Sequence, residues 1–217
     1  MTLFLDLYRD RIPAADGARC ETGGPRMVYL VEGSASVAGH HLGADEGAWS
    51  DGPVDLAAGD HDALCWRFEL SNGDDGELAG VDSRRLLRAD LAPVDIADGG
   101  EWLMRLDSVA FPPGGCALLH THQGPGIRCL REGSIRIDSE GHSTGYGIGE
   151  PWFEAGPEPV FAAADATMPS RFIRAMVLPG HLAGRSSIRY VREEDHDKPK
   201  SQSYRVYAEQ RLHPASS

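Results

Sequence analysis

The feature that most constrains the fold of this 217-residue chain is an internal repeat, because the chain matches itself after a shift of 100 residues. Turn residues and short apolar segments recur at matched places in the two halves. The matching pairs include, with small gaps, Pro13 and Pro113, Gly24 and Gly124, Pro25 and Pro125, Leu30 and Leu130, Glu32 and Glu132, Gly33 and Gly133, Trp49 and Trp152, and Arg67-Phe68 and Arg171-Phe172. The repeat predicts two related units, covering roughly residues 11–80 and 101–180.

Each half has the pattern of an all-β unit. Its apolar runs are short and separated by frequent turn residues, as in a sandwich or barrel. The segments 27–33 and 127–133 are typical of strands that end at a Glu-Gly turn, and a polar return strand follows each of them. We therefore predict an all-β fold built from two similar units.

Two further segments connect and extend these units. Residues 71–100 are rich in Gly, Asp and Ala and are interpreted as the connection, within which 84–91 fits either a short helix or a strand. The tail, 181–217, contains two strand-like pieces, 187–191 and 204–208. We expect this tail to pack over a barrel or over a partner subunit.

Composition excludes several classes of function. The formal net charge of -12 and the lack of a basic patch argue against a nucleic-acid-binding protein. The four cysteines form no CxxC pair, which favours reduced thiols over a disulfide framework. No secretory signal and no apolar run of about 20 residues is visible, so we expect a cytoplasmic protein that does not act at a membrane.

The strongest candidate for chemistry is the pair His120 and His122. They follow a Pro-Gly-Gly turn at 113–115 and lie two residues apart. Side chains alternate between the faces of a strand, so both imidazoles are expected on the same side. Two converging neutral imidazoles suit Zn, Cu, Fe or Ni, and this pattern therefore predicts a metal site.

These residues also carry a resemblance to a known family. Gly114, His120, His122 and Gly133 match the first motif of the cupins, and the segment 149–160 represents the second motif. With the duplication, the chain resembles a two-domain cupin, or bicupin, over about residues 11–180. The resemblance implies two tandem jelly-roll (double-stranded β-helix) barrels: an N-terminal barrel with linker at 1–95 and a C-terminal metal-binding barrel at 96–180. It also implies a homodimer.

The chain departs from the cupin ligand set at two positions. The residue expected to be the ligand Glu is Gly126, and the one expected to be the third ligand His is Val160. Glu154 is our candidate for the third ligand, because a regular strand would turn it inward six residues before Val160. The resulting set of His120, His122 and Glu154 would hold one divalent first-row transition metal (Fe, Mn, Zn or Ni), with Fe(II) favoured.

The N-terminal unit serves as an internal control for this assignment. After the shift of 100, Cys20 and Thr22 occupy the two histidine positions and Arg26 occupies the glutamate position. We predict that this unit binds no metal and has a structural role.

Three more residues are candidates for catalysis. Arg128 shares the inward face with position 126, where it could clamp a substrate carboxylate or pair with an internal acid such as Glu154 or Glu158. His142 and Tyr146 lie close by in sequence and are candidate donors or proton-transfer groups.

These residues predict a metal-dependent enzyme that acts on a small anionic organic molecule, with an Fe(II)-type dioxygenase favoured. A redox-neutral isomerase, lyase or hydrolase and a noncatalytic ligand-binding bicupin are the alternatives.

Overall fold

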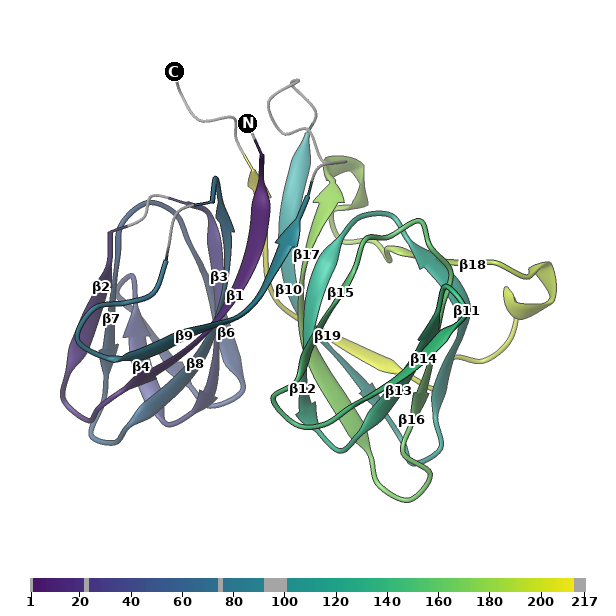
Figure 1. Cartoon of the computed structure of the whole chain (residues 1–217), viewed down its shortest axis with the longest axis horizontal. Helices are drawn as coiled ribbons and strands as arrows, with labels where there is room; N and C mark the ends of the chain where they lie inside the picture. The colour runs from purple at the N-terminus through teal and green to yellow at the C-terminus, as the bar shows by residue number, and fades with distance from the viewer. Residues whose placement is uncertain (1, 22–23, 74–75, 92–100, 213–217) are drawn as a thin grey trace. The chain divides into compact units, whose positions relative to one another are not determined.

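The computed structural model describes residues 2–21, 24–73, 76–91 and 101–212. It divides into two compact units, Met1–Gly99 with Tyr207–Pro214 and Gly100–Val206 with Ala215–Ser217. Antiparallel strands make up both units (Figure 1). The predicted boundary at 95/96 lies outside the described residues. No helix in the described part of the chain is long and apolar enough to cross a membrane.

The N-terminal unit is built from two sheets. The five-stranded sheet has the order β6-β3-β8-β1-β9 and the four-stranded sheet the order β2-β7-β4-β5. The strands are β1 (Phe4–Ile12), β2 (Gly17–Cys20), β3 (Arg26–Glu32), β4 (Ser34–Val37), β5 (His40–Gly43), β6 (Glu46–Ser50), β7 (Val54–Ala58), β8 (Ala63–Ser71) and β9 (Asp82–Asp90). The segment whose secondary structure the sequence left open is therefore a strand, β9, which pairs with β1.

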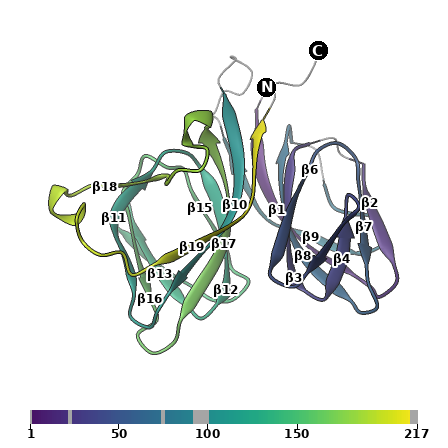
Figure 2. The same ribbon diagram turned by 180° about the vertical axis from the view of Figure 1, so that it is seen from behind.

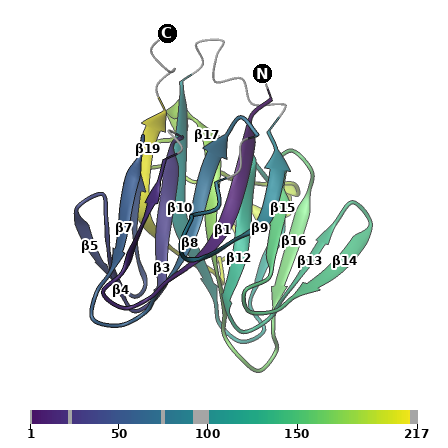
Figure 3. The same cartoon turned by 60° about the vertical axis from the view of Figure 1, so that its left-hand side comes forward.

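The C-terminal unit repeats this plan and adds one strand. Its sheets have the orders β15-β12-β17-β10-β19 and β14-β13-β16-β11-β18. The elements are β10 (Trp102–Phe111), β11 (Cys116–His122), β12 (Gly126–Glu132), β13 (Ile135–Ser139), β14 (His142–Tyr146), β15 (Pro151–Glu154), β16 (Val160–Ala164), β17 (Ser170–Pro179), the 3₁₀ turns η1 (Gly180–Leu182) and η2 (Glu193–Asp195), β18 (Ile188–Tyr190) and β19 (Ser203–Leu212). The first sheet and the β13–β14 hairpin stand out in Figure 3.

Strand register corrects one part of the repeat alignment. Leu30 lies opposite Cys65, and Leu130 lies opposite Phe172, so the residues two positions farther along β8 and β17 are Arg67 and Arg174. The sequence match between Arg67-Phe68 and Arg171-Phe172 is therefore out of register and wrong. The match arose because an Arg-Phe dipeptide occurs in both strands, although the arginines at 67 and 171 lie on different faces of their sheets.

The Glu-Gly turns explain why the repeat is visible in sequence. Gly33 and Gly133 both have a positive φ, of 80° and 72°. A Cβ at either position would also press on a backbone carbonyl, that of Asp62 or Pro169. Only glycine satisfies both conditions, so each turn retains it.

The tail contributes β19, which lies beside β10 as β9 lies beside β1, and β18, which has no counterpart among the described strands of the other unit. Strand β18 pairs with β11 directly at the two histidines, and His120 lies opposite Tyr190. Farther on, the Ser201 hydroxyl accepts a hydrogen bond from Cys116 N (2.9 Å) and donates one to Cys116 O (2.7 Å). The tail thus covers the free edge of β11 and then returns to β19 (Figure 2).

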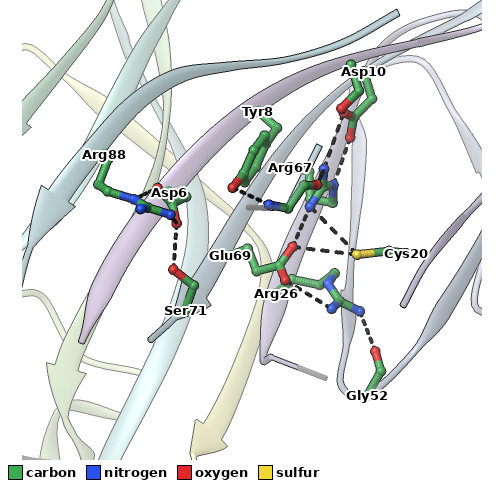
Figure 4. Close-up of polar contacts among 12 residues, drawn as sticks. Asp6, Tyr8, Asp10, Cys20, Arg26, Gly52, Arg67, Glu69, Ser71 and Arg88 are labelled. Atoms are coloured by element: carbon green, nitrogen blue, oxygen red, sulfur yellow. Dashed lines mark hydrogen bonds and ion pairs between the residues drawn. The ribbon is translucent and has the colours of Figure 1, made fainter. Parts of the chain in front are cut away.

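A closed network of charges fills the interior of the N-terminal unit (Figure 4). Arg67 donates to Asp10 Oδ2 at 2.8 Å and also pairs with Glu69, and its guanidinium lies 4.3 Å from the ring centroid of Tyr8. Glu69 also pairs with Arg26 at 3.2 Å. All of these side chains are buried, so each charge depends on its partners.

Cys20 occupies the place of the first histidine in this unit. It lies opposite Val54 in register, as His120 lies opposite Val160. Its sulfur contacts Glu69 and Arg67 at 3.8 and 3.9 Å. Thr22, at the second histidine position, lies outside the described residues.

The first prediction concerns this network. Arg67→Met should lower the free energy of unfolding of the N-terminal unit by about 3 to 5 kcal/mol, because it leaves Asp10 and Glu69 buried without their cation. Urea denaturation would measure the loss. The matched variant Arg19→Met removes an arginine that pairs with Asp55 and Glu21 at the surface and should have a much smaller effect. Equal losses in the two variants would contradict this account.

Candidate metal centre

The two histidines lie on the same face of β11 and point into the C-terminal barrel. His120 Nε2 and His122 Nε2 are 3.2 Å apart, and both side chains are about 95% buried. They line a cavity of about 20 Å³ inside the barrel, which is enough for about one water-sized particle. Strand alternation therefore places the imidazoles as the sequence suggested.

Hydrogen bonding fixes the tautomer of His120. Its Nδ1 lies 2.7 Å from the carbonyl oxygen of Leu118, which can only accept a hydrogen bond. The proton of the neutral ring is therefore on Nδ1, and the lone pair of Nε2 is directed toward His122 Nε2, from which it can accept a hydrogen bond. A backbone partner of this kind is the usual support of a metal-ligating imidazole.

Glu154 comes from β15 and takes the place that Gly126 leaves open. The two residues lie opposite each other in register. A Cβ at Gly126 would lie 2.6 Å from the carbonyl oxygen of Ala175, so position 126 does not accept the Glu of the cupin motif without a backbone shift. The carboxylate reaches the site from the neighbouring strand instead, and its Oε2 lies 3.1 Å from His122 Nε2.

Arg128 is bound to Glu154 inside the barrel. Arg128 Nη2 lies 2.8 Å from Glu154 Oε2, and Nη1 donates to the carbonyl oxygen of Gly126. The sequence left open whether Arg128 clamps a substrate or pairs with an internal acid, and the structure has the pair. The guanidinium is fully buried, so it is not displayed to a ligand as a free clamp.

The two oxygens of the Glu154 carboxylate have different partners. Oε1 accepts a hydrogen bond from Trp152 Nε1 at 2.9 Å. Oε2 lies 2.8 Å from Arg128 Nη2 and 3.1 Å from His122 Nε2, and among the described residues it has no other polar partner. A lone pair of Oε2 is therefore available beside the imidazoles.

Two of the donor–donor distances agree with those between neighbouring ligands of one metal ion. Two ligands at about 2.0 to 2.1 Å from a tetrahedral or octahedral ion are about 2.9 to 3.4 Å apart. The Nε2–Nε2 distance of 3.2 Å and the Nε2–Oε2 distance of 3.1 Å fall within that range. As they stand, however, the side chains of residues 2–212, leaving out the undescribed gaps, form no group of three or more His, Cys, Asp or Glu that could hold a metal ion. Arg128 currently competes for the third donor.

Burial and charge set the protonation of the three groups. Burial lowers the pKa of His122 to about 3 and also lowers that of His120. Burial alone would raise the pKa of Glu154, but Arg128 and the neighbouring imidazole hold it well below its usual range. The site at neutral pH therefore has two neutral imidazoles and one carboxylate, the forms that bind a metal.

Sequence reasoning did not identify the second charged pair in the cavity. Arg174 donates to Asp107 through Nε (2.6 Å) and Nη2 (3.1 Å), and all of these atoms are buried. The tail adds Ile188, Gln202 and Tyr204 to the lining. The strand parity of Arg174 could have indicated its inward position, but a tail that folds back over the barrel leaves no local signal.

His142 and Tyr146 do not line the cavity that holds the histidines. They line a separate pocket of about 350 Å³ next to it, together with Trp152 and Glu154. Tyr146 stacks on Trp152 with the ring centroids 4.7 Å apart. The structure therefore brings together His120, His122, Glu154 and Arg128, and leaves these two candidates beside the group.

Solved structures with this architecture include oxalate decarboxylase OxdC from Bacillus subtilis. A deletion mutant of OxdC gives a TM-score of 0.60 at 12% identity, over 89% of this chain and 73% of that chain. The same enzyme at pH 4.6 gives 0.59 at 13% identity, over 89% and 72%. AerE from Microcystis aeruginosa gives 0.57 at 10% identity, over 79% of this chain and 87% of that chain.

The fold is a cupin fold. The prediction of an all-β jelly-roll architecture is confirmed, while identities of 10% to 14% extend no further than the fold. No protein-family model matches the chain, and no curated protein matches it in sequence.

The second prediction concerns pH. The folded pKa of His122, about 3, lies below the unfolded value of 6.5, so its contribution to stability is present above pH 6.5 and is lost as the pH falls toward 3. His122 alone should remove about 2 kcal/mol from the free energy of unfolding of the metal-free protein between pH 7 and pH 5. Denaturation at each pH would measure it.

His122→Gln should flatten this dependence, whereas His142→Gln, which removes an exposed imidazole, should retain it. A slope that is the same in the parent protein and in His122→Gln would contradict the assignment.

Proposed function

We propose that the C-terminal barrel is the site of a metal-dependent enzyme that acts on a small organic molecule. The observation that carries this proposal is the approach of His120 Nε2 and Glu154 Oε2 to His122 Nε2, at 3.2 and 3.1 Å, which is the spacing of neighbouring ligands on one ion. The ion is one divalent first-row transition metal, since imidazole with carboxylate suits Fe, Mn, Zn and Ni.

The three residues act as a facial set, with the remaining coordination positions left to water or substrate. Bound there, an Fe(II) or Mn(II) ion would supply Lewis-acid or oxygen chemistry. The side chains of Val109, Phe111 and Phe172 line the same cavity and make part of its wall apolar. The Arg174–Asp107 pair balances its own charge, so the ion adds positive charge that favours an electron-rich substrate group.

Two observations bear on the reaction. A two-histidine, one-carboxylate set is typical of Fe(II) oxygenases, and on it we base the proposal of a dioxygenase-type oxidoreductase. Among proteins of the same fold, the oxalate decarboxylase of Bacillus subtilis has Mn(II) centres, which makes Mn(II) and a redox-neutral lyase or isomerase reaction the second candidate. Oxygen consumption by the Fe(II)-loaded and the Mn(II)-loaded protein separates the two.

The expectation of an anionic substrate rested on Arg128 as a carboxylate clamp. That guanidinium is already paired with Glu154, and Arg174 is paired with Asp107. Neither arginine is left over for a substrate carboxylate. The proposed enzyme therefore has no preformed anion clamp in its cavity.

The Arg128–Glu154 pair also favours the noncatalytic alternative, a ligand-binding barrel in which the guanidinium takes the place of the metal. Its buried positive charge neutralises the Glu154 carboxylate without any ion. Metal affinity decides between the two, because a resident metal must displace Arg128 from Oε2 or share this oxygen with it.

The third prediction tests the proposed function directly. Protein purified without a polyhistidine tag should contain close to one first-row metal per chain by elemental analysis. His120→Ala and His122→Ala should each lose this metal, because each removes one of two imidazole donors. Cys20→Ala, at the equivalent place in the other unit, is the matched control and should retain it. A metal-free parent protein, with no uptake on dialysis against Fe(II) or Mn(II), would refute the metal centre.

The fourth prediction concerns the competing arginine. Arg128→Met should lower the stability of the metal-free protein, because Glu154 then lies buried without a cation. The same variant should bind Mn(II) at least tenfold more tightly, because the ion no longer competes with the guanidinium. Calorimetric titration measures the affinity. Unchanged or weaker binding would show that Glu154 is not a ligand.

A further inference from the structure

The pocket beside the metal centre has the size and position of a ligand-binding site. Its volume of about 350 Å³ lies in the range of small-molecule pockets. Residues of the β13–β14 hairpin, of β15, of the loop that follows β15 and of the start of β16 line it. Ile137, Glu154 and Val160 belong both to this pocket and to the small cavity of the histidines. One layer of side chains therefore separates the pocket from the proposed metal.

The charge of this pocket is negative. Glu140, Glu154 and Glu158 line it, and its lining contains no Lys or Arg. Arg128, behind Glu154, offsets that one carboxylate, which leaves Glu140 and Glu158. Anions are therefore disfavoured here and cations attracted.

Glu158 supplies a specific anchor. Its Oε2 is buried and has no hydrogen-bond partner among the residues that the structure describes. A carboxylate oxygen shielded from water without a donor costs free energy, which a ligand N–H group would recover once the partly exposed Glu158 side chain turns this oxygen toward the pocket. The ligand that fits this atom is a hydrogen-bond donor, and a charged ammonium fits it best.

Aromatic rings supply the apolar part of the pocket. Tyr146 rests on Trp152 with centroids 4.7 Å apart and planes inclined by 25°. Trp152 is only 4% exposed and is fixed by its hydrogen bond to Glu154 and by the edge of Phe172, 5.2 Å away. Tyr146 is thereby held rigidly at the pocket. A ring beside carboxylates attracts organic cations both electrostatically and by apolar contact.

We propose that this pocket binds a small organic amine in its ammonium form, with the nitrogen at Glu158 and the apolar body against Tyr146. As a statement about the substrate, this inference rests on the proposed function. The binding itself does not require the metal. The sequence predicted an anionic substrate, and this inference proposes a cationic one instead.

Three probes of the same shape and different charge test this inference: benzylammonium, benzyl alcohol and benzoate. Each is titrated by calorimetry into the full-length, EDTA-treated protein at pH 7.5. Benzylammonium should bind at least tenfold more tightly than benzyl alcohol, and benzoate should show no binding. Benzoate that binds as well as benzylammonium would overturn the proposal.

Variants locate the site. Glu158→Gln should weaken benzylammonium about tenfold and leave benzyl alcohol unchanged. Tyr146→Leu should weaken both probes about fivefold. Glu194→Gln removes the same charge from an exposed turn of the same unit and should change neither probe. Unchanged benzylammonium affinity in Glu158→Gln would also overturn the proposal, since attraction would then come from the overall negative charge.

The two proposals fail separately. One metal per chain without selectivity for benzylammonium removes the amine inference and keeps the metal centre. Selective, Glu158-dependent binding in a protein that takes up no metal supports the amine inference and removes the metal-dependent enzyme.

Discussion

The proposed metal centre depends on one buried oxygen, Glu154 Oε2, which lies between a guanidinium and an imidazole. Arg128 lies 2.8 Å away on one side and His122 lies 3.1 Å away on the other. The carboxylate stays ionised in the barrel because of these neighbours, and the charge of a metal would replace that of Arg128. Everything proposed for the centre follows from how this oxygen is shared.

The two units show how one architecture supports two interiors. In the N-terminal unit, Arg67 already holds the carboxylates of Asp10 and Glu69. In the C-terminal unit, the equivalent arginine, Arg174, is paired with Asp107, and the histidines converge beside an unsaturated carboxylate oxygen. The two interiors differ because the C-terminal unit has a neutral imidazole, that of His120, where the N-terminal unit has Cys20 beside its charge network.

The all-β repeat and the orientation of the two histidines could be predicted from the sequence. The contacts that complete the site could not, for physical reasons. Strand alternation placed His120 and His122 on one face, and turn glycines revealed the repeat. The sequence alignment missed that Arg67 and Arg174 occupy equivalent positions in the two units. Strand register depends on the neighbouring strand and cannot be read from local sequence similarity. The position of Glu154 beside Gly126 and the tail over the cavity are likewise contacts between distant segments, to which sequence spacing gives no access.

Anomalous X-ray scattering from crystals soaked in Mn(II) tests the central claim most directly, because it gives the position and the ligands of the ion together. The account predicts one strong peak about 2.0 to 2.3 Å from His120 Nε2, His122 Nε2 and a Glu154 oxygen, with Arg128 moved away from that oxygen. A barrel without a peak, in which Glu154 still pairs with Arg128 at saturating Mn(II), would contradict it.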